Sequence, residues 1–258
     1  MDVSKPEFLD VGGIAIAYRR QAGSGPGVVW LGGYKSDMLG TKAETLSQWA
    51  SARGNAFLRH DYSGHGESAG VFADGTISRW LAESLAVFRA FTNGPQILVG
   101  SSMGAWIALR MNQELGRSGE GARIAGIVLL APAPDFTHEL VEPKLTAADR
   151  ADLESKGYFE VPSDYSAEPY IYTRDLIEDG RANLVMTGPL DTHCSVHIIQ
   201  GLADPDVPHS HALKLMSLLS ADDATLALVP DGDHRLSRPQ DLEMLTRAVQ
   251  SMAERAAK

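Results

Sequence analysis

The sequence is poor in cysteine, in positive charge and in long apolar runs. Its 258 residues include one cysteine, Cys194, so an internal disulfide is excluded and nothing indicates an oxidising compartment. Lys and Arg number 23 against 33 Asp and Glu, and the net charge of −10 repels nucleic-acid phosphates and anionic lipid. The longest apolar stretch, Ile124 to Ala133, is far shorter than the roughly 20 residues that cross a bilayer. We therefore expect neither a nucleic-acid partner nor a membrane span.

Signals for targeting and for bound cofactors are also missing. The opening residues, Met1 to Glu7, have neither the basic and apolar regions of a signal peptide nor the Arg-rich bias of a transit peptide, which predicts a cytoplasmic protein. The chain has no HExxH motif, no paired cysteines and no Gly-Lys-Ser/Thr motif, so we expect no metal and no cofactor. The glycine-rich stretch 23–27 precedes a strand instead of following one, which indicates a turn.

Short apolar runs alternate with helical patterns along most of the chain. This alternation predicts an α/β fold, a mostly parallel twisted sheet with helices on both faces. A hairpin across Gly12-Gly13 would form one edge of the sheet. The predicted strands are Phe8 to Val11, Ile14 to Tyr18, Val28 to Leu31, Ala56 to Arg59, Ile97 to Val99, Ile124 to Leu130, Val196 to Gln200 and Leu226 to Val229.

The alternation breaks between Ala133 and Cys194, where two strands are farther apart than one crossover helix requires. We therefore divide the chain into a core, residues 1–134 and 193–258, and an inserted cap, residues 135–192. The cap has 13 acidic against 5 basic residues and so holds most of the negative charge. It is expected to contain two helices, Thr146 to Gly157 and Arg174 to Leu184, and an aromatic group, Tyr158, Phe159, Tyr165, Tyr170 and Tyr172.

The strongest chemical signal is Gly100-Ser101-Ser102-Met103-Gly104. It follows the apolar run 96–99 and opens the helical stretch from Ala105, which is the strand–turn–helix context of a G-x-S-x-G nucleophile elbow. The residues two before and two after the nucleophile must be small so that strand and helix can approach. This register selects Ser102 over Ser101, because Met103 would otherwise occupy a position that requires a small residue.

A serine hydroxyl needs a base, and the base needs an orienting acid. In the chain order of this fold, the acid follows a late strand, where Asp204 and Asp206 lie in one loop. Asp204 is the preferred acid because the Asp204-Pro205 step ends the strand, and Asp206 is the alternative, more suited to shaping the turn. His234 follows the last strand and is the predicted base. The oxyanion donors are expected to be the amides of Met103 and Tyr34.

Several motifs together resemble the α/β-hydrolase superfamily over essentially the whole chain, and within it the branch of palmitoyl-protein thioesterases and acyl-glucuronide esterases. These motifs are residues 31–38 (LGGYKSDM), 40–43 (GTKA), 61–66 (DYSGHG), 204–208 (DPDVP) and 232–237 (GDHRLS). The resemblance implies the same nucleophile, acid, base and oxyanion amides as the positional argument. It departs from many superfamily members at Gly32-Gly33, where those have His-Gly. Segment 61–66 is expected to shape a loop near the site.

These observations predict a serine esterase or thioesterase that acts through an acyl-enzyme on Ser102. Its substrate would be a small-molecule ester or thioester with an apolar acyl group, and an acylated protein is a further candidate. The acidic cap is expected to disfavour multiply anionic leaving groups such as coenzyme A, unless Arg174 or Arg181 lines the mouth. Two alternatives stay open, a cofactor-free lyase or C–C bond hydrolase on the same fold, and a non-catalytic binding protein.

Overall fold

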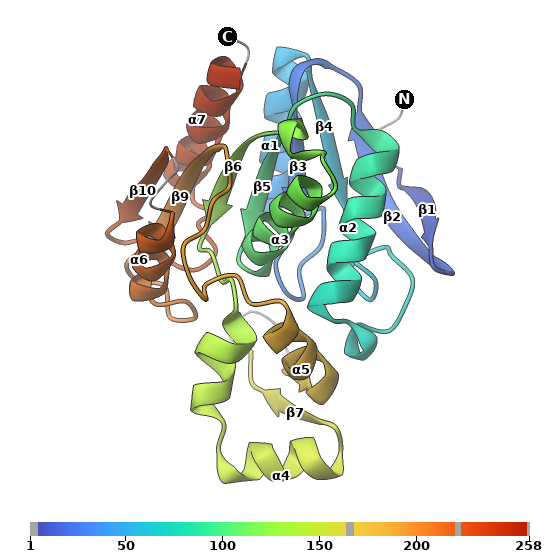
Figure 1. Ribbon diagram of the computed structural model, residues 1–258, viewed down its shortest axis with the longest axis vertical. Coiled ribbons are helices and arrows are strands. Elements are labelled where there is room, and N and C mark those ends of the chain that lie inside the picture. The colour runs from blue at the N-terminus through green and yellow to red at the C-terminus, as the bar shows by residue number, and fades with distance from the viewer. Residues whose placement is uncertain (1–4, 164–167, 220–222, 257–258) are drawn as a thin grey trace.

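The computed structural model describes residues 5–163, 168–219 and 223–256, and its centre is an eight-stranded sheet (Figure 1). The strand order is β1-β2-β4-β3-β5-β6-β9-β10. β1 and β2 form an antiparallel hairpin, β2 pairs antiparallel with β4, and all other neighbours in the sheet are parallel. The strands are β1 (Glu7–Val11), β2 (Ile14–Gln21), β3 (Ser24–Leu31), β4 (Asn55–His60), β5 (Gln96–Ser101), β6 (Ile124–Leu130), β9 (Ser195–Gly201) and β10 (Ala224–Val229).

The predicted strands are confirmed, with one error at the start of β3. The glycine-rich stretch predicted as a turn is largely part of that strand, because β3 begins at Ser24. Its pairing with β4 shifts register between Ser24 and Val28, so the glycines form an irregular strand start. At the hairpin, Gly12 and Gly13 have φ values of 62° and 86°, which glycine adopts without strain.

Helices cover both faces of the sheet (Figure 1). One face packs on α2 (Ile77–Phe91), α3 (Met103–Arg117) and α6 (His209–Leu218), with Trp80 and Trp106 fully buried between them and the strands. The other face packs on α1 (Thr41–Arg53) and α7 (Pro239–Ala256) through apolar side chains such as Leu46 and Val249. Short helical turns occur at Phe72–Asp74, Gly121–Arg123, Thr137–Val141 and Glu142–Lys144. In the part of the chain described, no helix is long and apolar enough to cross a membrane.

The segment between β6 and β9 stands off the carboxyl end of the sheet (Figure 1). It contains α4 (Ala147–Ser155), a two-stranded sheet of β7 (Tyr158–Val161) and β8 (Tyr170–Thr173), and α5 (Arg174–Ala182). α4 begins at a capping box on Thr146, and α5 contacts α2 where the Asp179 carboxylate accepts the Ser78 amide at 2.8 Å. The predicted Tyr165 lies outside the described residues. The boundaries of the cap stay a prediction.

Candidate active site

Ser102 lies at a strained turn between β5 and α3. Its φ of 55° and ψ of −119° are unfavourable for a residue with a side chain, and the surrounding structure holds them in place. The Ser102 amide donates to the Leu130 carbonyl at 2.9 Å, and the Ser102 carbonyl accepts the amides of Ala105 and Ala133 at 3.0 and 3.2 Å. The fixed backbone therefore holds the Ser102 hydroxyl at the carboxyl end of the sheet.

The two flanking glycines are required by close backbone contacts. A Cβ at Gly100 would lie 2.4 Å from the Gly104 carbonyl oxygen, and a Cβ at Gly104 would lie 2.1 Å from the Leu31 carbonyl oxygen. Strand, turn and helix pack too closely here for any side chain at either position. This is the physical reason that the motif has small residues on both sides of Ser102.

The structure brings Ser102, His234 and Asp204 together from three separate segments. His234 Nε2 lies 3.1 Å from Ser102 Oγ, and His234 Nδ1 lies 2.8 Å from Asp204 Oδ2. The two loops that carry the acid and the imidazole touch through glycines, because a Cβ at Gly201 would lie 2.2 Å from the Gly232 carbonyl oxygen. A proton could therefore pass from the hydroxyl to the imidazole while the carboxylate orients the ring.

Asp204 is the fully buried member of this group, with a side-chain exposure of 0%, against 17% for His234. Burial by itself would raise the pKa of Asp204. This effect is outweighed by the hydrogen bond and charge of His234 and by hydrogen bonds from two backbone amides, so the pKa of Asp204 is lowered. Those amides, of Asp206 and Val207, each donate to Oδ1 at 2.9 Å. Gln200 Nε2 also donates to Oδ2 at 3.2 Å. The carboxylate is thus held as an anion that faces the imidazole.

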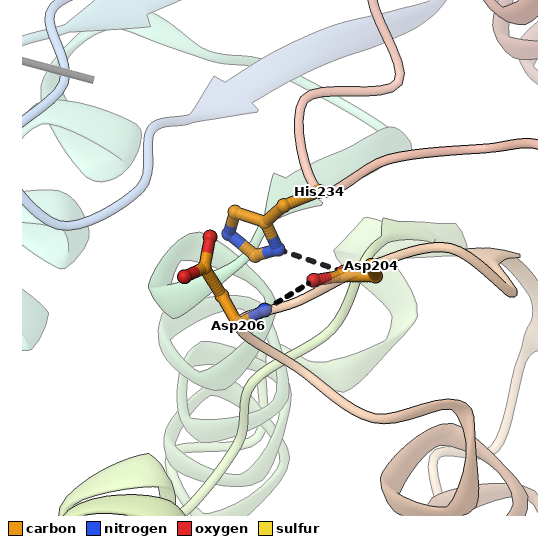
Figure 2. A group of neighbouring side chains, drawn as sticks. All are labelled: Asp204, Asp206 and His234. Atoms are coloured by element: carbon orange, nitrogen blue, oxygen red, sulfur yellow. Dashed lines mark hydrogen bonds and ion pairs between the residues drawn. The ribbon is translucent and has the colours of Figure 1, made fainter. Parts of the chain in front are cut away.

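Asp206, the alternative acid, occupies a different place. Figure 2 shows its carboxylate across the His234 ring from Asp204, while its backbone amide donates to Asp204. Among the described residues, Asp204, Asp206 and His234 are the set whose donor atoms lie close enough, within 4.8 Å, to hold a metal ion. However, both Asp204 oxygens already accept hydrogen bonds from the protein, so this set does not fit a metal site well.

The loop after β3 lies directly against the turn at Ser102. A Cβ at Gly33 would lie 3.3 Å from Ser102 Cβ, so the residue before Tyr34 lies against the turn that carries the hydroxyl. No hydrogen bond found among the described residues uses the Tyr34 amide. Met103 is the first residue of α3, where an amide has no partner within the helix. The assignment of these two amides as oxyanion donors stays a prediction.

Two cavities open onto Ser102 and His234. One, of about 490 Å³, is called the apolar cavity here because apolar side chains predominate in its described wall, among them Met103, Phe136, Leu140, Val141, Leu145, Phe159, Val161 and Tyr172. Lys144, Asp149, Glu160 and Asp206 also line it. The other, of about 590 Å³, is called the polar cavity here because polar and charged residues predominate in its described wall, among them Lys35, Ser36, Asp37, Thr41, Lys42, Glu168, Arg235 and Ser237. Trp30, Tyr34 and Tyr170 also line it. The reacting groups thus lie between a cavity lined mainly by apolar residues and one lined mainly by polar residues.

The sequence reasoning missed two residues that support this site. Gln200, fully buried at the end of β9, binds both Asp204 and the Val207 carbonyl, at 3.2 and 3.1 Å. The sequence indicated this residue only by placing a polar side chain at the end of an apolar strand. His65 contacts the loop after β3, and its only signal was its place in the motif at residues 61–66.

Comparisons with known proteins identify the family and the fold of this chain. A family model described as alpha/beta hydrolase family matches residues 25–244. Mouse palmitoyl-protein thioesterase ABHD10, mitochondrial, is 29% identical over 241 residues, covering 93% of this chain and 79% of that protein. Its solved structure superposes with a TM-score of 0.86, covering 97% and 99% of the two chains at 28% identity. A solved protein from Agrobacterium vitis S4 is 53% identical, with a TM-score of 0.93 and coverage of 96% and 98%.

These comparisons also correct one prediction. A cytoplasmic location was inferred from the opening residues, and this is wrong, because the curated relatives are mitochondrial proteins. The predicted fold is confirmed as the α/β-hydrolase fold. With the family model matching well over half of its length, the chain is a hydrolase and belongs to the alpha/beta hydrolase family.

Proposed function

We propose that this hydrolase cleaves carboxylic esters or thioesters through an acyl-enzyme on Ser102. The observation that supports this most directly is the continuous path from Asp204 to His234 to Ser102, with contacts of 2.8 and 3.1 Å below a strained turn. Ser102 is the proposed nucleophile, His234 the general base and Asp204 the orienting acid. The hydrogen bond of Asp204 to His234 Nδ1 and the two amides that hold its carboxylate favour it over Asp206 for that role.

In the proposed reaction, His234 Nε2 removes the proton from Ser102 as Oγ attacks the carbonyl carbon. The amides of Tyr34 and Met103 donate to the oxyanion, and Asp204 stabilises the imidazolium that forms. His234 then protonates the departing alcohol or thiol as the carbon–oxygen or carbon–sulfur bond breaks. A water molecule, deprotonated by the same imidazole, attacks the acyl-enzyme, which releases the carboxylic acid and restores the Ser102 hydroxyl.

The apolar cavity is the proposed site of the acyl group. Much of its wall comes from the segment proposed as the cap, residues 135–192, including Phe136, Phe159 and Tyr172. These side chains remove apolar acyl carbons from water, at roughly 25 cal/mol for each Å² buried. The relative named a palmitoyl-protein thioesterase acts on a long apolar acyl group, which fits such a compartment. An acylated protein therefore stands beside small esters and thioesters as a proposed substrate.

The polar cavity is the proposed site of the alcohol or thiol portion and of the hydrolytic water. Arg174 and Arg181, which could have offset the negative charge of the cap at the mouth of the site, are not among the described residues of its wall. Arg181 pairs with Glu142 at 2.7 Å, and Arg174 donates to backbone carbonyls at the end of α4. Preference against coenzyme A thioesters stays a prediction, tested by comparing kcat/KM for a coenzyme A thioester with that for a neutral thioester of the same acyl group.

A fluorophosphonate probe tests the proposed mechanism, because it labels a serine only where a base activates the hydroxyl. We expect the wild type and the Ser101→Ala variant to be labelled, and the Ser102→Ala variant to lose both labelling and ester turnover. An unlabelled wild type would favour a binding protein. A labelled wild type that turns over no ester or thioester, yet cleaves carbon–carbon bonds, would favour the lyase alternative.

A further inference from the structure

The loop that carries the Tyr34 amide is held at three points by the segment that follows β4. Tyr62 Oη donates to the Gly32 carbonyl at 3.1 Å. Asp61 Oδ1 accepts the Met38 amide at 2.6 Å, and His65 Nε2 accepts the Lys35 amide at 3.2 Å. Two of these bonds lie at the ends of the loop, whereas the bond to Lys35 lies next to Tyr34.

The turn within this loop fixes the direction of the Tyr34 amide. The Ser36 amide donates to the Gly33 carbonyl at 3.2 Å, and the Gly33 amide donates to Ser36 Oγ at 3.0 Å. In a trans peptide the C=O and N–H groups point in opposite directions, so the Tyr34 N–H points away from Ser36. The turn closes only because Lys35 adopts a φ of 55°, an unfavourable value for lysine that needs a stabilising contact.

His65 supplies that contact in a single tautomer. Its Nδ1 lies 3.1 Å from the Ser63 carbonyl, which only accepts, so Nδ1 carries the proton and Nε2 is free to accept from Lys35. Burial lowers the pKa of His65 to about 4, which keeps the ring neutral near pH 7. Protonation would turn Nε2 into a donor facing the Lys35 N–H, and the contact would be lost.

The His65 ring is fixed by its neighbours and is not exposed to substrate. It is 4% exposed and packs against Tyr62, Phe72 and Trp80 with ring centroids 5.0 to 5.5 Å away. Trp80 Nε1 also donates to the Ser63 carbonyl at 3.2 Å, which anchors the partner of Nδ1. Among the described residues that line the two cavities, His65 is not found. Any effect on catalysis must therefore pass through the loop.

We propose that His65 is a positioning residue whose Nε2 holds the strained Lys35 peptide and thereby aims the Tyr34 amide at the oxyanion. The inference rests on the proposed function, since it assigns His65 a part in stabilising the charge that forms when Ser102 attacks. Loss of this acceptor releases the turn at Lys35 and moves the Tyr34 amide, while the path from Asp204 to Ser102 stays intact.

The test compares His65→Ala with His65→Gln, whose side-chain oxygen can accept the Lys35 amide in place of Nε2. His65→Ala is expected to lower kcat roughly tenfold to 100-fold, because small displacements of an oxyanion donor are costly, with KM changed less than about threefold. A boronic acid that forms a tetrahedral adduct should bind more weakly by the same factor as kcat/KM falls. Binding of the carboxylic acid product should not change. His65→Gln should return kcat to within about fivefold of wild type.

The matched control is His60→Ala, which removes another buried imidazole. His60 Nε2 contacts Ser84 and its ring packs on Tyr62, but no hydrogen bond found among the described residues joins His60 to the loop. It is expected to keep the wild-type kcat at a temperature where circular dichroism shows all variants folded. The proposal is overturned if His65→Ala keeps its kcat, if His60→Ala loses as much, or if boronate and product binding weaken together. Failure of the proposed function is distinguishable, because the wild type itself would then escape fluorophosphonate labelling.

Discussion

Replacing Asp204 by asparagine would change the proton on His234 while leaving the shape of the site intact. The two backbone amides that donate to Asp204 Oδ1 require an oxygen at that position, so the asparagine side-chain oxygen must take it. The side-chain NH₂ group then faces His234 Nδ1, which must become an acceptor. Nε2 consequently carries the ring proton and points it at Ser102 Oγ, 3.1 Å away.

The magnitude follows from this change of tautomer. An imidazole whose Nε2 is already protonated cannot accept the serine proton, and a comparable substitution in another serine hydrolase lowers kcat about 10⁴-fold. At about 1.36 kcal/mol for each factor of ten, this is a loss of about 5.5 kcal/mol of transition-state stabilisation. The two amide hydrogen bonds persist with a neutral acceptor, and the 3.2 Å bond from Gln200 Nε2 to Oδ2 is lost, so the free energy of unfolding should fall by about 1 to 3 kcal/mol.

The assay is hydrolysis of a chromogenic short-chain ester, with urea denaturation as a check on folding. Asp206→Asn is the matched control, because it makes the same chemical change two residues away, across the His234 ring (Figure 2). We expect that control to stay within about tenfold of the wild-type kcat. Folded Asp204→Asn protein with kcat within tenfold of wild type, or an equal loss in Asp206→Asn, would refute the assigned roles of the two carboxylates.

Two further predictions concern stability. Gly104→Ala should lower the free energy of unfolding by about 3 kcal/mol or more in urea, because its Cβ would lie 2.1 Å from the Leu31 carbonyl oxygen. Gly116→Ala, in open space on the same helix, should raise it by up to about 1 kcal/mol, and equal effects would contradict this packing argument. Burial lowers the pKa of His60 from 6.5 to about 4, so between these values the unfolded chain binds a proton that the folded chain does not. Between pH 7 and pH 4, the free energy of unfolding of the wild type should therefore fall by up to about 3 kcal/mol more than that of His60→Gln, as measured by urea titration. A difference in unfolding free energy between the two proteins that does not change with pH would rule out a buried neutral His60.

Much of the fold could be predicted because strand and helix patterns are local. Apolar runs that alternate with helical patterns gave all eight strands of the large sheet. The one error, the turn predicted at residues 23–27, arose because glycines also occur where a strand starts irregularly. The position of the nucleophile elbow could also be predicted from the sequence, because backbone crowding at Gly100 and Gly104 restricts which residues can flank Ser102.

The location and the supporting contacts could not be predicted in the same way. A cytoplasmic location rested on the opening residues, and the mitochondrial relatives overturn it. The sequence favoured Asp204 through the Asp204-Pro205 step but left Asp206 as an alternative, because both carboxylates lie in one loop and have the same charge. Only the folded loop distinguishes them, with Asp204 buried on the Nδ1 side of His234.

The sequence by itself determined the order of strands and helices and the residue at the sharp turn, because those depend on neighbours close along the chain. The tertiary structure decided which carboxylate meets His234, where the apolar and polar cavities meet, and which side chain supports the Tyr34 loop. Those contacts join residues 30 to 132 positions apart, such as His65 with Lys35 and His234 with Ser102. Their geometry depends on how the loops pack at the end of the sheet, which a one-dimensional pattern does not record.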